Sequence, residues 1–597
     1  MRIRAFLVFL FLFLCAQLAF AQNGPVEATN PYKSQLDRLE SLTKVAQPEW
    51  RFHADVPHPE DPALHDSEWQ ALTVGTKWSD GPRVLRRWIE VPPAIEGYST
   101  QGARVSLDLN LSSDAAMVIT VFSNGSIVYR GNEDMQQPIV LTENAQPGQK
   151  FLVAVRMNTS NVPSQIRRSE LEIEPSERPD PAFIRMEILA AQPLISAYME
   201  GKAEREQILD AAVKAIDFGS LEKGDQQAFD ASLQASQTKL EELKPWLKQF
   251  TIRAVGNSHI DMAWLWPESE TVEVARNTFQ SVLDLMREYP DFKFTMSSAR
   301  TYEWMEEKYP DLFAQIKERV KEGRWEVIGG MWVEPDLNLP TGESLVRQIL
   351  IGKRYFEKKF GIDVKIGWNP DSFGYNWQLP QIYKRSGMDY FVTQKLLWAH
   401  EFTTFPYKMF DWEAPDGSRL LTYFPHDYAG GIEGPALGKD LSIWGPEIYG
   451  PKVNKDTEIM HLYGVGDHGG GPTRTMLDTA VQLRQPNTVF PNIQFSTAAD
   501  FFKEIETKLT PISDRPAISV PVWKGELYFE YHRGVQTTQA ETKKRIRLNE
   551  EAMLDAEKFA SIASLHGETY PQRTFERNWK RLLFDQFHDI MPGSGIG

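Results

Sequence analysis

The 597-residue sequence predicts a multidomain protein in which an N-terminal β-sandwich precedes a central α/β region and a C-terminal helical bundle. The length allows three or four domains. Between about residues 65 and 178, short apolar runs alternate with polar residues and are broken by Gly, Asn and Pro. From 251 to about 505, strand patterns alternate with helix patterns, which is typical of a mostly parallel sheet or an incomplete barrel.

The first 21 residues have the features of a secretory signal. Arg2 and Arg4 precede an apolar run over residues 6–14, and a small-residue cleavage pattern ends at Ala21. The sequence therefore predicts a secreted or periplasmic protein with no membrane attachment after cleavage, because this run is short for a bilayer span. The single cysteine, Cys15, lies inside the signal, so the mature chain would have no disulfide.

The charge of the chain narrows the classes of partner. A formal net charge of −16 disfavours nucleic acid and anionic membrane surfaces. A neutral substrate such as a glycan is compatible with this charge. The 17 Trp residues could serve as platforms on which sugars stack, although core packing is their commoner use.

Residues 22–178 are predicted as the β-sandwich domain, beginning with a polar arm that extends to residue 48. Strand patterns are clear at 104–109, 117–122 and 151–155, and Asn124-Gly125 is a hairpin signal. This pattern is typical of the jelly-roll kind of sandwich. Such modules bind sugars or brace a neighbouring domain, and bracing is favoured here.

Three further segments complete the predicted organisation. Residues 179–250 read as a helical linker, with apolar positions at helical spacing in 208–216. The α/β domain is predicted over 251–510 and a helical region over 511–597. Seven strand candidates fall in the α/β domain, at 251–255, 292–296, 325–328, 364–368, 390–393, 460–463 and 493–495.

The first of these strands is followed by His259 and Asp261. Residues i and i+2 of an extended chain point to the same side, so both side chains can reach one point. Imidazole nitrogen and carboxylate oxygen are ordinary ligands of Zn²⁺. For this pair alone, a capping Asp and a hydrogen-bonded His in a plain loop is the favoured alternative.

Three later stretches strengthen the metal-site interpretation. Asp371 lies after a strand in a turn rich in Gly and Pro, Asp467 and His468 precede three glycines, and His588 lies near the C-terminus. Polar residues at the carboxyl ends of parallel strands build the active sites of α/β folds. The sequence therefore predicts that these groups meet at one edge of the sheet.

Together these motifs resemble glycoside hydrolase family 38, the retaining α-mannosidases, in their bacterial and secreted form. The resemblance covers roughly residues 250–597, and further matches are Gly330–Asp336 and Gly525–Gly534. It implies a seven-stranded, barrel-like β/α catalytic domain followed by a three-helix bundle. Family members continue into β-rich domains, so the resemblance also predicts that this chain is a fragment, a truncated product or one of two partner chains.

The resemblance implies roles for individual residues. Zn²⁺, or another divalent ion, would be held by His259, Asp261, Asp371 and His588. Asp371 would also be the nucleophile and Asp467 the acid/base, with His468 as the alternative to Asp467. The implied substrate-binding residues are Asp336, Lys395, Asp589, Trp332 and Trp264.

The function predicted on these grounds is hydrolysis of terminal α-D-mannosyl residues of glycans by a metal-assisted double displacement. One alternative is a zinc-dependent carbohydrate deacetylase, which also surrounds a metal with Asp and His but needs a separate base to activate water. Another alternative is a non-catalytic glycan-binding fragment, which the β-module and the early C-terminus suggest.

Overall fold

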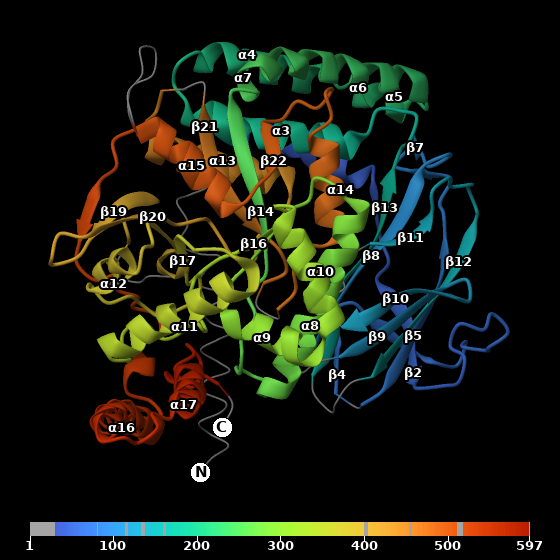
Figure 1. Cartoon of the computed structure of the whole chain (residues 1–597). Helices are drawn as coiled ribbons and strands as arrows, with labels where there is room; N and C mark the ends of the chain where they lie inside the picture. Colours follow the sequence, from blue (N-terminus) through green and yellow to red (C-terminus); the bar gives the residue numbers. More distant parts are fainter. Residues whose placement is uncertain are drawn as a thin grey trace. The chain divides into compact units, whose positions relative to one another are not determined.

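The computed structural model describes residues 30–79, 81–113, 117–132, 138–158, 163–398, 404–452, 456–466, 469–509 and 518–595. The predicted signal at 1–21 and the predicted acid/base residues, Asp467 and His468, lie outside this part of the chain. The chain divides into two compact units, one formed by residues up to Arg185 with Asp210–Thr238, the other by Met186–Leu209 with Lys239–Gly597 (Figure 1). Within the described ranges, no helix has both the length and the apolar character that crossing a bilayer requires.

The first unit is rich in β-structure, as predicted. Its larger sheet has the strand order β10-β9-β12-β5-β2-β3, and a second sheet has the order β1-β13-β8-β11 with β4 on β13. The strands of both sheets pair antiparallel. Side chains from both sheets, such as Leu107 of β8 and Val153 of β12, belong to one buried apolar core.

The strands of this unit have the following bounds: β1 Lys44–Ala46, β2 Glu49–Ala54, β3 Gln70–Thr73, β4 Lys77–Trp78, β5 Arg83–Glu90, β6 Ala94–Ile95, β7 Tyr98–Ser99, β8 Arg104–Ser113, β9 Val118–Ser123, β10 Ser126–Asn132, β11 Ile139–Thr142, β12 Lys150–Asn158 and β13 Ser164–Glu174. Strands β6 and β7 form a separate two-stranded ribbon.

The segment predicted as a helical linker does hold helices, and it is divided between the two units. These helices are α3 (Pro181–Ala197), α4 (Lys202–Ala215), α5 (Phe218–Glu222), α6 (Gln226–Leu240), η1 (Glu241–Leu243) and α7 (Lys244–Leu247). An earlier helix, α2 (Lys33–Ser41), precedes the first strand.

The second unit contains two sheets, and the parallel one carries the first predicted metal ligands. Its order is β16-β15-β14-β21, with β22 alongside the first half of β14. The other sheet has the order β17-β18-β20-β19-β23, in which β19 runs antiparallel to β20. The bounds are β14 Phe250–Asn257, β15 Phe294–Met296, β16 Trp325–Val327, β17 Ile366–Trp368, β18 Tyr390–Val392, β19 Met409–Glu413, β20 Arg419–Tyr423, β21 Thr457–Tyr463, β22 Asn492–Phe495 and β23 Val522–Lys524.

Each of the seven predicted strands of the α/β region coincides with an observed strand, and β19, β20 and β23 were not predicted. These three belong to the second sheet, where β19 and β20 form a hairpin with Asp416-Gly417 at its turn. An α/β architecture in a multidomain chain is therefore confirmed, but its strands number more than seven and form two separate sheets in the described residues.

Helices alternate with these strands, and the apolar residues of the helices recur on one face. The helix α8 shows this pattern, with Val272, Phe279 and Leu283 all buried. The other helices are α9 (Ala299–Lys308), α10 (Pro310–Lys321), α11 (Gly342–Phe360), α12 (Leu379–Arg385), η2 (Lys395–Leu397), α13 (Gly434–Tyr449), α14 (Arg474–Leu483) and α15 (Ala498–Leu509), while α8 itself is Glu268–Glu288.

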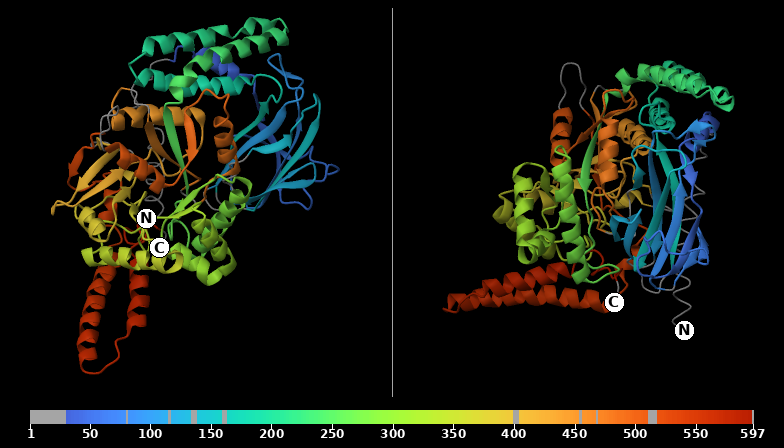
Figure 2. Two further views of the ribbon diagram at one scale, coloured as in Figure 1. Left: turned by 45° about the horizontal axis from the view of Figure 1, so that its top comes forward. Right: turned by 90° about the vertical axis from the view of Figure 1, so that its right-hand side faces the viewer.

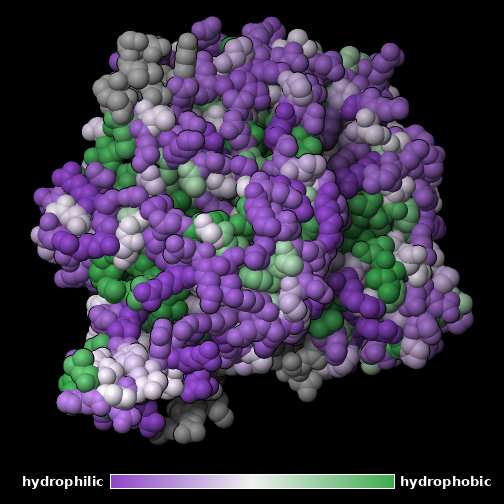
Figure 3. Space-filling model, in the orientation of Figure 1, coloured by the Kyte–Doolittle hydropathy of each residue, from purple (hydrophilic) through white to green (hydrophobic). Residues whose placement is uncertain are grey.

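The C-terminal part of this unit is helical. After η3 (Arg533–Gln536), α16 (Ala540–Leu565) and α17 (Gln572–Phe584) form a hairpin whose helices lie side by side (Figure 2). Described residues 518–595 contain two α-helices, and the three-helix bundle stays a prediction. Polar side chains cover most of the face shown in Figure 3, which accords with a chain that is 24% charged.

Candidate active site and metal centre

Four side chains from separate segments of the second unit meet at one point. They are His259, Asp261, Asp371 and His588, each of which offers a ligand atom, and these four atoms all lie within 4.8 Å of one another. All four residues are buried, between 0% and 7% exposed. The resemblance to family 38 predicted this set, and the structure brings these residues, which lie far apart in the chain, close together.

The first pair is delivered by strand β14, which ends two residues before His259. His259 Nε2 lies 2.9 Å from Asp261 Oδ1. The turn around Asp261 is held because the Trp266 indole donates to its carbonyl at 3.0 Å and the Thr271 hydroxyl donates to the same carbonyl at 3.2 Å. The pair therefore sits on a fixed backbone.

Asp371 is delivered by strand β17 and the turn that follows it. Gly367 in this strand allows close packing, since a Cβ there would lie 2.7 Å from the Tyr383 ring. The Tyr375 hydroxyl donates to the Asn369 carbonyl at 3.0 Å, and the Ser372 hydroxyl donates to the carbonyl of Pro335 at 2.9 Å. These bonds fix the turn on both sides of Asp371.

The two oxygens of Asp371 have different partners. Lys395 and Tyr428 both donate to Oδ1, the tyrosine at 2.9 Å. Oδ2 lies 3.6 Å from His588 Nε2 and 3.9 Å from His259 Nε2. The Asp371 carboxylate thus contacts the Lys395 ammonium through Oδ1 and faces the two imidazoles through Oδ2.

His588 comes from the loop after α17. Its Nε2 lies 3.2 Å from Asp261 Oδ1, and its ring stacks on the His259 ring with 5.3 Å between centroids. Its Nδ1 lies 2.8 Å from the main-chain carbonyl of Glu334. An isolated antiparallel bridge between Pro335 and Phe587 brings these two loops together.

The charges of the cluster shift the pKa values of its members. Burial lowers the pKa of His259, but Asp261 and Glu334 outweigh it and raise that pKa well above its ordinary value. For His588, burial is likewise outweighed, and the hydrogen bond to Asp261 with the charge of Asp589 raises the pKa to about 9. Burial opposes ionisation of Asp371, yet Lys395 and the two imidazoles lower its pKa.

These features fit a divalent cation. Two imidazoles and two carboxylates are a donor set that suits Zn²⁺ and related ions. In the absence of a cation, the acidic side chains hold protons on the imidazoles, and those protons are what a metal would displace on binding. A bound cation would then balance the charge of the buried carboxylates in place of those protons.

Comparison with known proteins agrees with this geometry. The model "Glycosyl hydrolases family 38 N-terminal domain" matches residues 249–526, and "Alpha mannosidase middle domain" matches residues 530–597. The chain belongs to glycosyl hydrolase family 38. The matched regions contain all four members of the His/Asp cluster.

Several curated proteins resemble this family 38 chain. "Alpha-mannosidase G" of Dictyostelium discoideum is 41% identical over 352 residues, which cover 58% of this chain and 31% of the relative. "Alpha-mannosidase" of Saccharomyces cerevisiae is 39% identical over 357 residues, covering 58% and 32%. The chain therefore spans about a third of the length of these relatives. An alpha-mannosidase structure from Enterococcus faecalis V583 aligns with a TM-score of 0.49 at 21% identity, covering 58% of this chain and 39% of that one.

Two of the predicted substrate-binding residues lie at the cluster of this family 38 site. Lys395 is buried against Asp371, and its ammonium lies 3.5 Å from the centroid of the Trp398 ring. Asp589 accepts a hydrogen bond from Ser594 at 2.5 Å and lies 3.7 Å from His588 Nε2. Burial and the charge of Asp261 raise the pKa of Asp589 to about 7. Their contact with sugar stays a prediction.

Asp336 and Trp264 have less direct placements. Asp336 is fully buried, and its Oδ1 accepts from the backbone N–H groups of Asn338 and Leu339 at 2.8 and 2.7 Å. It therefore stabilises its own loop, and its role toward a sugar stays a prediction. Trp264 is half-buried and meets Trp266 edge-on, with 5.8 Å between ring centroids.

Trp332 requires a correction. It was predicted as a surface on which sugar could stack, but it is 0% exposed. Its indole donates to the Lys580 carbonyl at 3.1 Å, and its ring meets Tyr355 edge-on. The apolar ring is used for packing against helices α11 and α17, so it has no free face for a sugar.

Two residues of the site were not predicted from the sequence. Tyr428 binds Asp371, but it lies 57 residues away in a loop without a distinctive pattern. Glu334 contacts both imidazole ligands, and it lies in the Gly330–Asp336 stretch that was recognised only as a whole motif. Its position two residues before Asp336 is the one signal that could have drawn notice.

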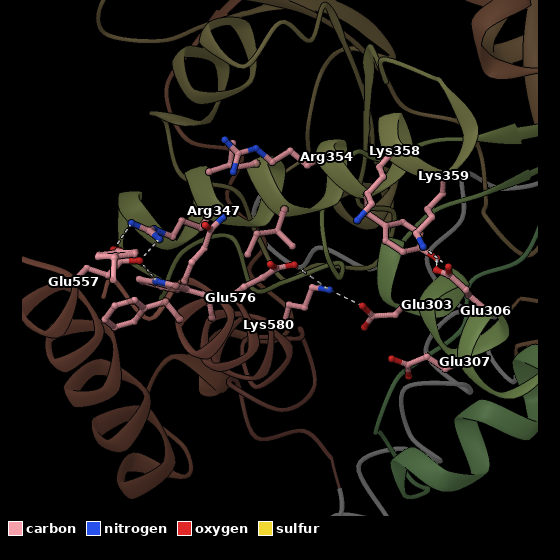
Figure 4. A pocket seen from close by; sticks show the side chains of 17 residues that line it. Glu303, Glu306, Glu307, Arg347, Arg354, Lys358, Lys359, Glu557, Glu576 and Lys580 are labelled. Carbon is pink, nitrogen blue, oxygen red and sulfur yellow. Dashed lines mark hydrogen bonds and ion pairs between the residues drawn. The ribbon is translucent and has the colours of Figure 1, made fainter. Parts of the chain in front are cut away.

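A charged pocket of about 650 Å³ lies elsewhere in the same unit, between helices α9, α11, α16 and α17 (Figure 4). Three of its cations, Arg347, Lys359 and Lys580, pair with anions of the lining. Arg347 binds Glu557 through two bonds of 2.8 and 2.6 Å, and Lys580 binds Glu303 at 2.5 Å. None of the four His/Asp ligands lines this pocket.

Proposed function

We propose that this chain forms the metal-binding catalytic part of a retaining α-mannosidase that hydrolyses terminal α-D-mannosyl residues of glycans. The observation that supports this most directly is Asp371, an ionised carboxylate that touches both the His/Asp cluster and a Lys–Tyr pair. The family membership of the chain and the names of its curated relatives favour the same activity.

In the first step, the Asp371 carboxylate attacks the anomeric carbon of the mannoside. The bond from that carbon to the leaving oxygen breaks, and Asp467 gives this oxygen its proton. The product is a mannosyl ester on Asp371. Lys395 and Tyr428 keep the carboxylate ionised and oriented before the attack, since both donate to Oδ1.

In the second step, water attacks the same carbon and gives its proton to the Asp467 carboxylate. The ester bond breaks, Asp371 leaves as a carboxylate, and mannose is released with its original α configuration. The donors at Oδ1 stabilise the carboxylate that re-forms. Two inversions at one carbon explain the retention.

Zn²⁺, or another divalent ion, would be held by His259, Asp261, Asp371 and His588. When bound, it would act as a Lewis acid toward hydroxyl groups of the sugar. Lys395, Asp589 and Asp336 are proposed to bind further hydroxyls.

We extend the proposal to the rest of the chain. The β-rich first unit is a sandwich, the α/β strands are arranged in a barrel-like way, and the C-terminal helices belong to a three-helix bundle. Residues 1–21 direct the chain to a secreted or periplasmic location. Nucleic acid is not a proposed partner.

An aryl α-mannoside assay tests the activity. We expect release of the aryl alcohol, and proton NMR should show the α anomer of mannose as the first product. First formation of the β anomer would rule out the retaining mechanism, and acetate release from an acetylated glycan in place of mannose would favour the deacetylase.

Asp371→Asn is the matched chemical test. Because the amide cannot attack as a carboxylate does, we expect turnover to fall by at least about 10³-fold, or about 4 kcal/mol of transition-state free energy. Asp363→Asn is the control, since its side chain is 56% exposed and lies outside the cluster. Equal losses in both variants would contradict the assignment.

A further inference from the structure

Glu334 is a buried glutamate that the mechanism above does not use. It lies between strand β16 and helix α11 and is 5% exposed. A lone buried carboxylate is costly, so its partners indicate why it is there. The polar groups of Glu334 contact both imidazoles of the cluster and one serine.

The side chain of Glu334 faces His259. Its Oε2 lies 3.2 Å from His259 Nδ1, within ion-pair distance although the two groups are not aligned as a good hydrogen bond. Its Oε1 accepts a hydrogen bond from the Ser297 hydroxyl at the end of strand β15. Ser297 therefore fixes the carboxylate so that its other oxygen points at the imidazole.

The main chain of Glu334 holds His588. The Glu334 carbonyl oxygen lies 2.8 Å from His588 Nδ1 and accepts from the His588 backbone N–H at 3.2 Å. A carbonyl can only accept, so Nδ1 of a neutral His588 must carry the proton. Its Nε2 is then the nitrogen with a free lone pair, and Nε2 is the atom that faces Asp261 and Asp371.

The same reasoning applies to His259. A carboxylate beside Nδ1 favours the proton on that nitrogen and leaves the lone pair on Nε2, which faces Asp261. One residue thus selects the same tautomer in two imidazoles, through its side chain in one case and its carbonyl in the other. Acceptors on the far nitrogen of a metal-binding histidine raise metal affinity and orient the ring.

We infer that Glu334 is the positioning residue for both imidazole ligands of the metal, and that its side chain acts on His259 alone. This inference rests on the metal site of the proposed function. The backbone of Glu334 is placed independently of its side chain, because the Asp336 N–H donates to the Gln586 carbonyl at 2.9 Å and Pro335 bridges Phe587. Gly352 of α11 adds to this, since a Cβ there would lie 2.4 Å from the Gly330 carbonyl.

The test compares Glu334→Leu with Glu334→Gln. Leucine removes the acceptor, while the glutamine carbonyl can still accept from His259 and its amide can donate to Ser297. Zinc dissociation constants are measured on the full chain by competition with a chromophoric chelator. We expect affinity to fall about 10- to 100-fold in Glu334→Leu and to be largely restored in Glu334→Gln.

Two further measurements separate positioning from a general structural role. The visible spectrum of the cobalt-substituted chain should change in Glu334→Leu, because it reports the ligands around the metal. Circular dichroism of the metal-free variants should stay that of the wild type, since the main-chain bonds to His588 and Gln586 remain. If Glu334→Leu does not fold, Ser297→Ala provides the milder test, with an expected loss of about 2- to 10-fold in zinc affinity.

The outcomes are distinct. A wild-type chain that binds no zinc or cobalt overturns both the proposed metal site and this inference. A wild type that binds metal while Glu334→Leu binds it equally well, with an unchanged cobalt spectrum, overturns only the role of Glu334.

Discussion

Two charged clusters in the second unit, the His/Asp cluster and the pocket between α11 and α17, use similar residues in opposite ways. In the pocket, Arg347 pairs with Glu557, Lys359 pairs with Glu306 and Lys580 pairs with Glu303. In the His/Asp cluster, two carboxylates and two imidazoles point at one another within 4.8 Å. The paired charges of the pocket neutralise one another, whereas the carboxylates of the His/Asp cluster need a cation or protons to balance their charge.

Solvent exposure separates the two clusters further. The Arg347 and Glu557 side chains retain 20% and 17% of their exposure, so water and salt weaken their attraction. His588 retains 0% and Asp261 6%, and there the interactions are not screened. Pocket volume is therefore a poor indicator of the reactive site in this molecule, and the direction in which buried polar atoms point is a better one.

The largest effect that would test this contrast is expected for His588→Ala. Removing one of four ligands should weaken zinc binding by at least about 100-fold and abolish the thermal stabilisation that zinc gives the wild type. Chelator competition and thermal unfolding with and without zinc measure both effects. His566→Gln is the control, because His566 is exposed and lies outside the cluster. Unchanged zinc affinity in His588→Ala would show that the convergence is not a metal site.

A buried carboxylate without converging partners provides the intermediate case. Glu187 of α3 is 0% exposed and accepts from the Val489 N–H at 2.7 Å. Burial raises its pKa from 4.5 to about 7. Its folded form therefore holds a proton more tightly than its unfolded form, so its contribution to stability is present below pH 4.5 and is lost as the pH rises through 7.

Glu187→Gln should remove this dependence, because the amide is neutral and its carbonyl can still accept from Val489. We expect the variant to be more stable than the wild type at pH 8, by up to about 3 kcal/mol, and nearly equal to it at pH 4. Denaturant unfolding of the metal-free proteins at the two pH values measures the difference. The same difference at both pH values would contradict the raised pKa.

The smallest effect is expected in the charged pocket between α11 and α17. A double-mutant cycle of Arg347→Met and Glu557→Gln should give a coupling energy of about 1 kcal/mol that declines with added salt. Zinc affinity and mannoside turnover should not change, because neither residue touches the His/Asp cluster. A loss of turnover without a loss of stability would mean that the pocket takes part in the reaction.

The resemblance to family 38 predicted the four residues of the His/Asp cluster because each lies in a short motif that can be matched without knowledge of the fold. Their role as metal ligands stays a prediction. The seven predicted strands were found because a run of apolar residues is likewise a local pattern. The β19–β20 hairpin was not predicted although Pro415-Asp-Gly417 marks its turn, because the β/α alternation of the flanking segments masks a local antiparallel pair.

Other features could not be predicted because they depend on distant contacts. Trp332 belongs to a motif that suggests a sugar platform, but helices α11 and α17 cover it. Tyr428 and Glu334 become part of the site only when loops from different strands meet. Tertiary packing decides which polar side chain faces the cluster, and a single sequence does not record that packing.

The spacing of the ligands along the chain has a consequence for how the protein is made. Asp261 and His588 are 327 residues apart. A ribosome therefore releases His259 and Asp261 long before His588, and until His588 emerges a nascent chain can offer no more than three of the four side chains. A cation held by all four, as proposed above, could be captured only after the segment that contains His588 has emerged and docked.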